Sequence, residues 1–159
     1  MTGRSGQRCV LLPVPGSGRL ADLLGHCRVE LVFTAAERRL SRRRGDLSSW
    51  AGRLAAKLAV LELFGRSTDS ALVGGLDLGW TSIEVLPSGP GQCADPLECR
   101  GTHRPEVFLR GSMARWLGPD ERLAVSISHT DTLAAALVAR VGVTGAGTAG
   151  TPERRHRRC

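Results

Sequence analysis

The stretch of sequence that decides the fold is SSWAGRLAAKLAVLELFG, residues 48–65. Its larger apolar residues recur at spacings of three and four, which is the period of one face of an α-helix. These residues are Trp50, Leu54, Leu58 and Leu61. Ser48 or Ser49 is suited to cap the start of such a helix, and Gly65 is suited to end it. We therefore expect one long helix that runs to Phe64.

Two basic residues, Arg53 and Lys57, lie one turn apart on a neighbouring face of this expected helix. Two positive charges at this spacing are able to hold one anionic ligand. A solvated helix face explains the same pair without any ligand. Both interpretations stay open on the local sequence.

On the N-terminal side of the long helix, a strand and two helices are expected. Residues 8–14 form a short apolar run closed by a Pro-Gly-Ser-Gly cluster, and residues 19–27 have helical spacing. Thr34 and Glu37 form a capping box, in which each side chain accepts a hydrogen bond from a backbone amide near the other residue. This box predicts a helix from Ala35 into the arginine cluster at 42–44.

On the C-terminal side, the pattern changes to the period of strands. Extended segments are expected at residues 80–86, 106–109, 125–128 and 133–141, with a short helix at 112–117. Residues 87–104 are rich in Gly, Pro, Cys and charge and are expected to form a loop. We predict one domain over residues 8–141, with a flexible N-terminus at 1–7 and a disordered basic tail at 142–159.

The composition bounds the class of protein. The chain has 159 residues, 42% of them hydrophobic, which is enough for one core. Its net charge of +7 comes almost wholly from arginine, since Lys57 is the one lysine. This charge indicates an acidic partner, although an arginine bias in the genome explains it equally well.

Neither the cysteines nor the N-terminus indicates an export route or a metal centre. The five cysteines have no paired CxxC spacing, so free thiols are expected. The apolar run at 10–14 is too short for a signal peptide or a membrane span. We therefore expect a soluble, cytoplasmic protein.

Four segments, taken together, carry a family resemblance. They are VFTAAE at 32–37, AGRLAAK at 51–57, LGWTSIEV at 78–85 and VSISHT at 125–130. In this order and spacing they resemble the small, holo-acyl-carrier-protein-synthase type of 4'-phosphopantetheinyl transferase. Each segment alone is common in proteins. The resemblance implies the α+β fold of that family, an antiparallel sheet packed against one long and several short helices.

The resemblance also implies a reaction. Members of the family transfer phosphopantetheine from coenzyme A, their substrate, to a serine of an acyl or peptidyl carrier protein. Mg²⁺ and a homotrimer with active sites between subunits belong to the same expectation. Attack of a hydroxyl on a pyrophosphate needs a cation across the phosphate oxygens, basic groups for the nucleotide and a base for the serine proton.

The two metal-binding acids of the family have no counterpart at the aligned positions of this chain. The family's Gly-x-Asp motif aligns with residues 8–10, so Val10 stands where the Asp belongs. In the long helix, Leu58 stands where the metal-binding Glu belongs. Glu62 replaces a family lysine and reverses its charge. It lies one turn from Leu58, about 6 Å along the helix axis, so it is a poor substitute ligand.

The remaining positions still offer groups for binding and catalysis. By resemblance, Lys57 and Glu62 are the candidate catalytic residues, and Arg53, Lys57 and His129 are candidates to hold coenzyme A. A structural histidine at a strand end explains His129 equally well. An acidic carrier protein would be oriented by complementary charge. The arginines proposed to dock it are Arg19, Arg28, Arg38, Arg39 and Arg42, with Arg43 and Arg44 beside them.

Three functions stay open on the sequence. The first is a working phosphopantetheinyl transferase. The second is an inactive or repurposed relative that binds a carrier protein in a polyketide or peptide synthase pathway, which the loss of both acids favours. The third is a basic nucleic-acid-binding module, which the 4% aromatic content, the absence of Tyr and the lack of a known recognition motif oppose.

Overall fold

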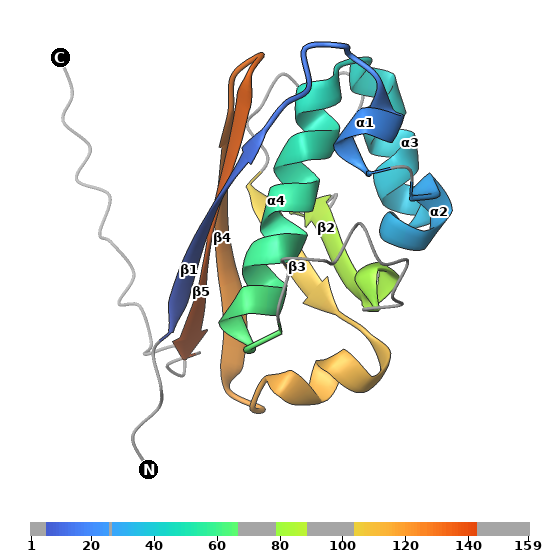
Figure 1. Ribbon diagram of the computed structural model, residues 1–159. Helices are drawn as coiled ribbons and strands as arrows, with labels where there is room; N and C mark the ends of the chain where they lie inside the picture. Colours follow the sequence, from blue (N-terminus) through green and yellow to red (C-terminus); the bar gives the residue numbers. More distant parts are fainter. Residues whose placement is uncertain (1–5, 26, 67–78, 89–103, 143–159) are drawn as a thin grey trace, which may run out of the picture.

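The computed structural model describes residues 6–25, 27–66, 79–88 and 104–142. Its centre is helix α4, Leu47–Leu63, which is enclosed on two sides (Figure 1). An antiparallel sheet in the order β1-β5-β4 packs on one side, and three short helices pack on the other. The predicted α+β class is confirmed, with antiparallel strands packed against one long helix, although the strands form two sheets rather than one.

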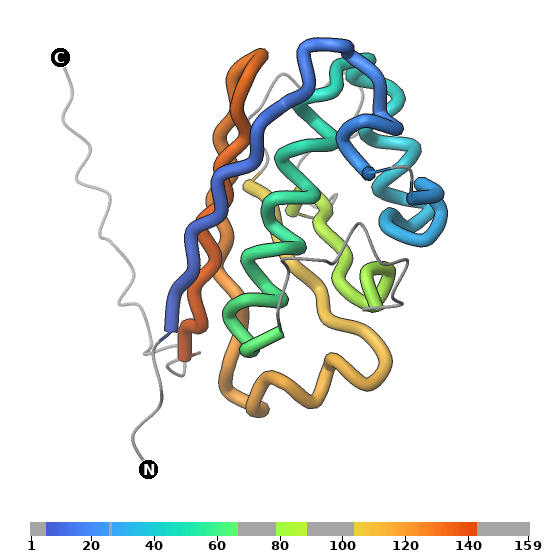
Figure 2. Tube along the Cα trace, viewed as in Figure 1, coloured from blue at the N-terminus to red at the C-terminus, as the bar shows by residue number. Residues whose placement is uncertain are grey.

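The elements follow the chain in a simple order. The strands are β1 (Gln7–Pro13), β2 (Ile83–Pro87), β3 (Pro105–Leu109), β4 (Glu121–His129) and β5 (Leu133–Gly142). The short helices are α1 (Leu20–Leu23), α2 (Val29–Val32) and α3 (Ala35–Arg44), with 3₁₀ turns η1 (Trp80–Ser82) and η2 (Gly111–Trp116). Strands β2 and β3 form a separate antiparallel pair. The tube in Figure 2 shows the first and last strands, β1 and β5, side by side.

The core lies around α4, which is buried nearly all the way round its first three turns. Leu54, Val60 and Leu61 have no exposed surface, and the intervening alanines are equally buried. Ala134, Ala136 and Val138 of β5 alternate with more exposed residues, as expected for a strand with one face on a core. A helix that is buried all round forces any polar residue on it to find a partner inside the protein.

The structure corrects the start of the long helix. The N-cap is Asp46, whose side chain accepts hydrogen bonds from the Ser49 amide at 2.7 Å and the Ser48 hydroxyl at 3.0 Å. The prediction of Ser48 or Ser49 as the cap is therefore wrong, because the carboxylate of Asp46 already satisfies the amide of the first turn. The predicted helix beyond Thr34 is correct, and its capping box with Glu37 is present.

Three other boundaries differ from the predictions. The helix expected at 19–27 is shortened to α1, and a second short helix, α2, was not predicted. The segment from Trp80 begins as the 3₁₀ turn η1 and becomes extended only at Ile83, because Gly79 at φ +69° turns the backbone before it. Strand β4 begins at Glu121, four residues before the predicted start. Of the N-terminus predicted to be flexible at 1–7 and the basic tail predicted at 142–159, residues 1–5 and 143–159 lie outside the described residues. Gln7 already belongs to β1, and Gly142 still belongs to β5.

Within the described part of the chain, no helix is long and apolar enough to cross a membrane. The outer face of the three-stranded sheet is nevertheless apolar. Leu11 is 64% exposed, Leu133 40% and Leu137 41%. Their cross-strand partners Pro13, Ala135 and Cys9 share this face, since directly paired residues point to the same side of a sheet. We call this set the outer sheet face; the described helices all lie on the other side (Figure 1).

Candidate functional site around the long helix

Lys57 sits at the centre of a buried polar network. Its ammonium donates hydrogen bonds to the Glu37 carboxylate at 2.8 Å, the Val32 carbonyl at 2.8 Å and the Trp80 carbonyl at 2.9 Å. The side chain has no exposed surface. An ammonium has three donors, and all three are used inside the protein. Lys57 therefore joins α4 to the end of α2, to α3 and to η1.

Glu37, on helix α3, forms an ion pair with this buried ammonium. One carboxylate oxygen accepts from the Lys57 ammonium and from the Thr34 amide at 2.8 Å. The other oxygen accepts from the Val85 amide of β2 at 2.9 Å. Burial lowers the pKa of Lys57, and the charge of Glu37 offsets part of this shift. The Phe33 ring, 5.3 Å from the Lys57 nitrogen, adds a cation–π contact.

A second carboxylate, Glu84 of β2, extends the network to the surface. It accepts from the Thr34 hydroxyl at 2.8 Å, and its other oxygen accepts from the Arg110 guanidinium. Burial raises the pKa of Glu84, but the hydrogen bonds from Arg110 and Thr34 outweigh burial and leave the pKa below its ordinary value. The carboxylate is therefore ionised at neutral pH, and its hydrogen bonds connect β2 to the start of α3 and to the start of η2.

Arg53 is one turn from Lys57, as predicted, but its guanidinium is held by the protein. It donates to the Ser41 hydroxyl at 2.9 Å, the Ser49 hydroxyl at 2.7 Å and the Val85 carbonyl at 3.3 Å. Burial lowers its pKa from the ordinary arginine value. The coenzyme-binding roles of Arg53 and Lys57 stay predictions. In this structure both side chains join α4 to α3; Arg53 also reaches β2, and Lys57 also reaches α2 and η1.

His129 lies on a different side of α4. It ends β4 on the face that points toward the helix, and it approaches α4 at Gly52. A Cβ atom built at Gly52 would be 3.9 Å from the His129 Cδ2 and only 2.8 Å from the Ile127 Cγ2. The structure thus brings Arg53 and Lys57 together but does not place His129 with them. In the sequence, the indication of this close approach is a glycine, Gly52, inside an otherwise strong helix pattern.

Replacing Gly52 with Ala should destabilise the protein by about 1–3 kcal/mol. An exposed helix would gain from this change, but here the added methyl overlaps Ile127, a β-branched side chain with little rotamer freedom. Urea denaturation measures the loss. In a double-mutant cycle, Ile127→Ala should remove most of the penalty of Gly52→Ala. A Gly52→Ala variant more stable than the parent would contradict the observed helix–strand approach.

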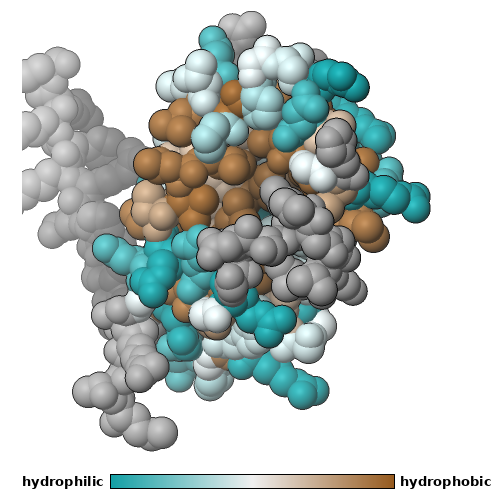
Figure 3. Space-filling view, in the orientation of Figure 1, coloured by the Kyte–Doolittle hydropathy of each residue, from teal (hydrophilic) through white to brown (hydrophobic). Residues whose placement is uncertain are grey.

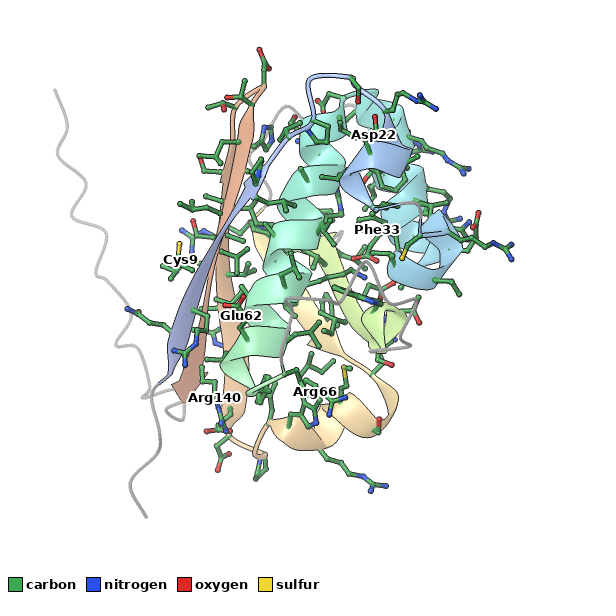
Figure 4. The ribbon with its side chains drawn as sticks, in the orientation of Figure 1. Cys9, Asp22, Phe33, Glu62, Arg66 and Arg140 are labelled. Carbon is green, nitrogen blue, oxygen red and sulfur yellow. The ribbon has the colours of Figure 1, made fainter. Side chains whose placement is uncertain are left out.

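The aligned metal positions are apolar in space as well as in sequence. Leu58 is 8% exposed and belongs to the hydrophobic core, and Val10 packs against that core from β1. Within the described ranges, no group of three or more His, Cys, Asp and Glu is placed to hold a metal ion. The residues at Val10 and Leu58 therefore do not fit Mg²⁺. Glu62 lies near the end of α4, half-buried and on the side nearer the strands (Figure 4).

The arginines predicted to dock a partner gather on the short helices. Arg19 precedes α1 and Arg28 precedes α2, while Arg38, Arg39 and Arg42 lie on α3. Glu30 engages two of them, at 3.9 Å from the Arg28 guanidinium and 3.4 Å from that of Arg38. Arg39 and Arg42 are exposed, as are Arg43 and Arg44. We call Arg39, Arg42, Arg43 and Arg44 the α3 arginines; their docking role stays a prediction.

One hollow opens at the start of α4. Its volume is about 190 Å³. Its lining includes the loop after β1, the Asp46–Ser48 cap and the turn between β4 and β5: Val14, Pro15, Gly16, Gly18, Asp46, Leu47, Ser48 and Asp131. With two carboxylates and no cationic side chain in this lining, the hollow is a poor site for a phosphate.

The sequence missed the partners of the two basic residues on α4. Glu37 and Ser49 were predicted only as capping residues, and Glu84, Arg110 and Ser41 had no predicted role. The sequence around Lys57 does indicate that this side chain is buried. Apolar residues such as Leu54, Val60 and Leu61 lie on every side of the helix around it, and this pattern predicts burial rather than a solvated face.

Solved structures of acyl carrier protein synthases match most of the chain. A complex with coenzyme A from Chronobacterium ammoniagenes has a TM-score of 0.59 and 28% identity, covering 87% of this chain and 97% of that one. The Mycobacterium tuberculosis acyl carrier protein synthase has a TM-score of 0.54 and 25% identity, covering 86% and 96%. A Helicobacter pylori complex with coenzyme A matches in fold alone, with a TM-score of 0.59 and 17% identity over 86% and 100%.

No protein-family model and no curated protein matches the chain. The comparison therefore rests on solved structures, which match this chain over nearly their whole length. The predicted resemblance to the holo-acyl-carrier-protein-synthase type of phosphopantetheinyl transferase is confirmed in fold, with 28% and 25% identity to the synthases from Chronobacterium ammoniagenes and Mycobacterium tuberculosis.

Proposed function

We propose that this protein takes coenzyme A as its substrate and transfers phosphopantetheine to a serine of an acyl or peptidyl carrier protein. The observation that carries the proposal is the match, at 28% identity over 87% of the chain, to an acyl carrier protein synthase solved with coenzyme A. The serine oxygen attacks the phosphorus that carries the pantetheine arm and forms the new phosphate ester. The P–O bond of the pyrophosphate breaks, and adenosine 3',5'-bisphosphate is the leaving group.

The carrier protein is proposed to dock on the side of α1 to α3. Four exposed guanidiniums of the α3 arginines lie on this side, and the protein as a whole carries a net charge of +7. Carrier proteins are acidic along their recognition helix, so charge complementarity would raise the association rate and orient the encounter. Glu30 moderates the charge at Arg28 and Arg38, which leaves the α3 arginines as the stronger contribution.

A homotrimer is part of the proposal, with copies of the chain meeting on the outer sheet face. This face exposes Leu11, Leu133 and Leu137 side by side on neighbouring strands. Exposed apolar residues that adjoin in this way mark interaction surfaces in soluble proteins. Figure 3 shows hydrophobic residues extending toward the edge where this sheet lies in Figure 1, and Figure 4 shows Cys9 pointing away from α4.

A second candidate function is carrier-protein binding without transfer. The apolar side chains of Val10 and Leu58, at the positions aligned with the family's metal ligands, favour it. In that case coenzyme A or the carrier protein still binds, but no arm is transferred.

The test is intact-protein mass spectrometry of apo carrier proteins incubated with coenzyme A and this protein. The expected result is a mass increase equal to one phosphopantetheine. An unmodified carrier protein that still binds the protein would favour the second function. Carrier proteins and coenzyme A that both fail to bind would contradict both functions.

A charge-reversed variant, Arg39→Glu with Arg42→Glu, makes this test specific. Both residues are exposed, so stability should change little, while transfer should slow because the association is electrostatically steered. The matched control is Arg115→Glu on η2, an exposed arginine away from both α3 and the outer sheet face, which should transfer at the parental rate. Equal slowing by both would contradict docking on the α3 side.

A further inference from the structure

We propose that this chain binds the phosphates of coenzyme A without a divalent cation, so that arginine side chains neutralise them in place of Mg²⁺. The inference rests on the proposed function for the identity of the ligand, and it concerns how that ligand is held. Four observations on the described residues support it.

The first observation concerns the aligned ligand positions. Mg²⁺ requires oxygen ligands, above all carboxylates, in near-octahedral geometry. Val10 and Leu58 offer only carbon atoms, and both pack against the hydrophobic core. Leu58 is 8% exposed, so it fills a place in the core rather than leaving a gap into which a ligand oxygen is able to move.

The second observation concerns the carboxylates of the buried network beside α4. Glu37 accepts three hydrogen bonds, from Lys57, Thr34 and Val85. Glu84 binds Arg110 and Thr34. Each carboxylate already has a cation as a partner, so moving either one to a metal would leave a buried or half-exposed cation unpaired.

The third observation concerns the two ends of α4. At its start, one Asp46 oxygen accepts from both the Ser49 amide and the Ser48 hydroxyl, and this cap begins the helix. Asp131, across the hollow, is exposed and is the one other carboxylate in that lining. At the far end, Glu62 already has a partner of its own. Asp46 and Glu62 thus already have partners, and within the described ranges no group of three or more His, Cys, Asp and Glu lies together to hold a metal ion.

The fourth observation is the charge of the chain. Arginine accounts for all but one of its basic residues, and the guanidinium binds phosphate oxygens through two parallel hydrogen bonds. A ligand held by guanidiniums is neutralised without a metal. Its affinity should fall as salt is added, because exposed charges are screened.

The test is calorimetric titration of the full-length protein with coenzyme A, once with EDTA and once with Mg²⁺. The expected result is the same Kd in both buffers, to within about twofold. A twofold difference is well under the tenfold change in affinity that corresponds to about 1.4 kcal/mol. A Kd weaker by about tenfold or more in EDTA would overturn the inference and leave the proposed function intact.

Two double variants make the test independent of coenzyme binding. Val10→Asp with Leu58→Glu places carboxylates at both aligned positions, and Val10→Asn with Leu58→Gln is the matched control, with the same shapes and no added charge. Both should lose a similar amount of stability from the core. Mg²⁺ alone should leave the melting temperatures of the parent and of the control unchanged and should raise that of the variant with two carboxylates.

The two measurements separate the possible failures. If coenzyme A does not bind in either buffer, the proposed function and the inference fail together, whereas binding that requires Mg²⁺ overturns the inference alone. A parent protein stabilised by Mg²⁺ in the absence of coenzyme A would overturn it. A parent protein that does not respond to Mg²⁺ would support it.

Discussion

Replacing Lys57 with Met should lower the free energy of unfolding by about 3–5 kcal/mol. Methionine has nearly the length of lysine, so the core stays filled, but the ammonium is lost. Glu37 would then keep a buried negative charge with no cation beside it, and the carbonyls of Val32 and Trp80 would lose their donor. Urea denaturation at one fixed protein concentration measures the loss, since the stability of an oligomer depends on concentration.

Two further variants show whether the buried charge is the cause. Glu37→Gln combined with Lys57→Met removes both charges, so the double variant should recover part of the loss even though it has one more substitution. Arg53→Met should cost less than Lys57→Met, because Arg53 is only partly buried and its partners are serines and carbonyls. If the free energy of unfolding of Lys57→Met were within about 1 kcal/mol of the parental value, the loss would be only that of an exposed ion pair, and this would contradict the buried ion pair.

Replacing Leu137 with Asp should convert the proposed trimer to a monomer. Leu137 is 41% exposed near the middle of β5, and Cys9 faces it from β1. A carboxylate there would have to be buried without a partner when three sheets pack together, and the cost of burying it would exceed what the contact contributes. Analytical ultracentrifugation should find three times the 16.9 kDa chain mass for the parent and the chain mass for the variant.

The control for this change is the same substitution at another exposed leucine. Leu31 of α2 is 58% exposed but lies among the short helices, away from the sheet. Leu31→Asp should leave the trimer intact, and circular dichroism should show both variants folded. Since the resemblance places active sites between subunits, Leu137→Asp should also lose transfer. A monomeric parent, or a trimeric Leu137→Asp variant, would refute assembly through the outer sheet face.

The metal question links the function to the fold. A transferase that works without Mg²⁺ and a carrier-binding relative that has lost transfer both agree with apolar Val10 and Leu58. Mass spectrometry separates these two functions, while the titrations with and without Mg²⁺ separate the two ways of holding coenzyme A. The results are independent, because binding of the coenzyme does not require that the arm be transferred.

Local sequence rules determined the elements of this protein. The spacing of apolar residues from Trp50 to Leu61 predicted α4, and the Thr34–Glu37 capping box predicted the start of α3. Alternation predicted β4 and β5 to within a few residues. These features depend on neighbours at most four residues away, so they can be read along the chain. The resemblance in four segments then predicted the fold that the solved structures confirm.

Only the tertiary structure decided what the polar residues do. Lys57 and Glu37 are 20 residues apart in the chain, and Glu37 and Val85 are 48 apart. Whether such groups bind a ligand or one another depends on which faces of α4 are covered, and packing decides that. Because α4 is buried nearly all round, the cost of an unpaired charge forces Lys57 to pair inside the protein, while the sheet leaves Leu11 and Leu137 exposed for a partner.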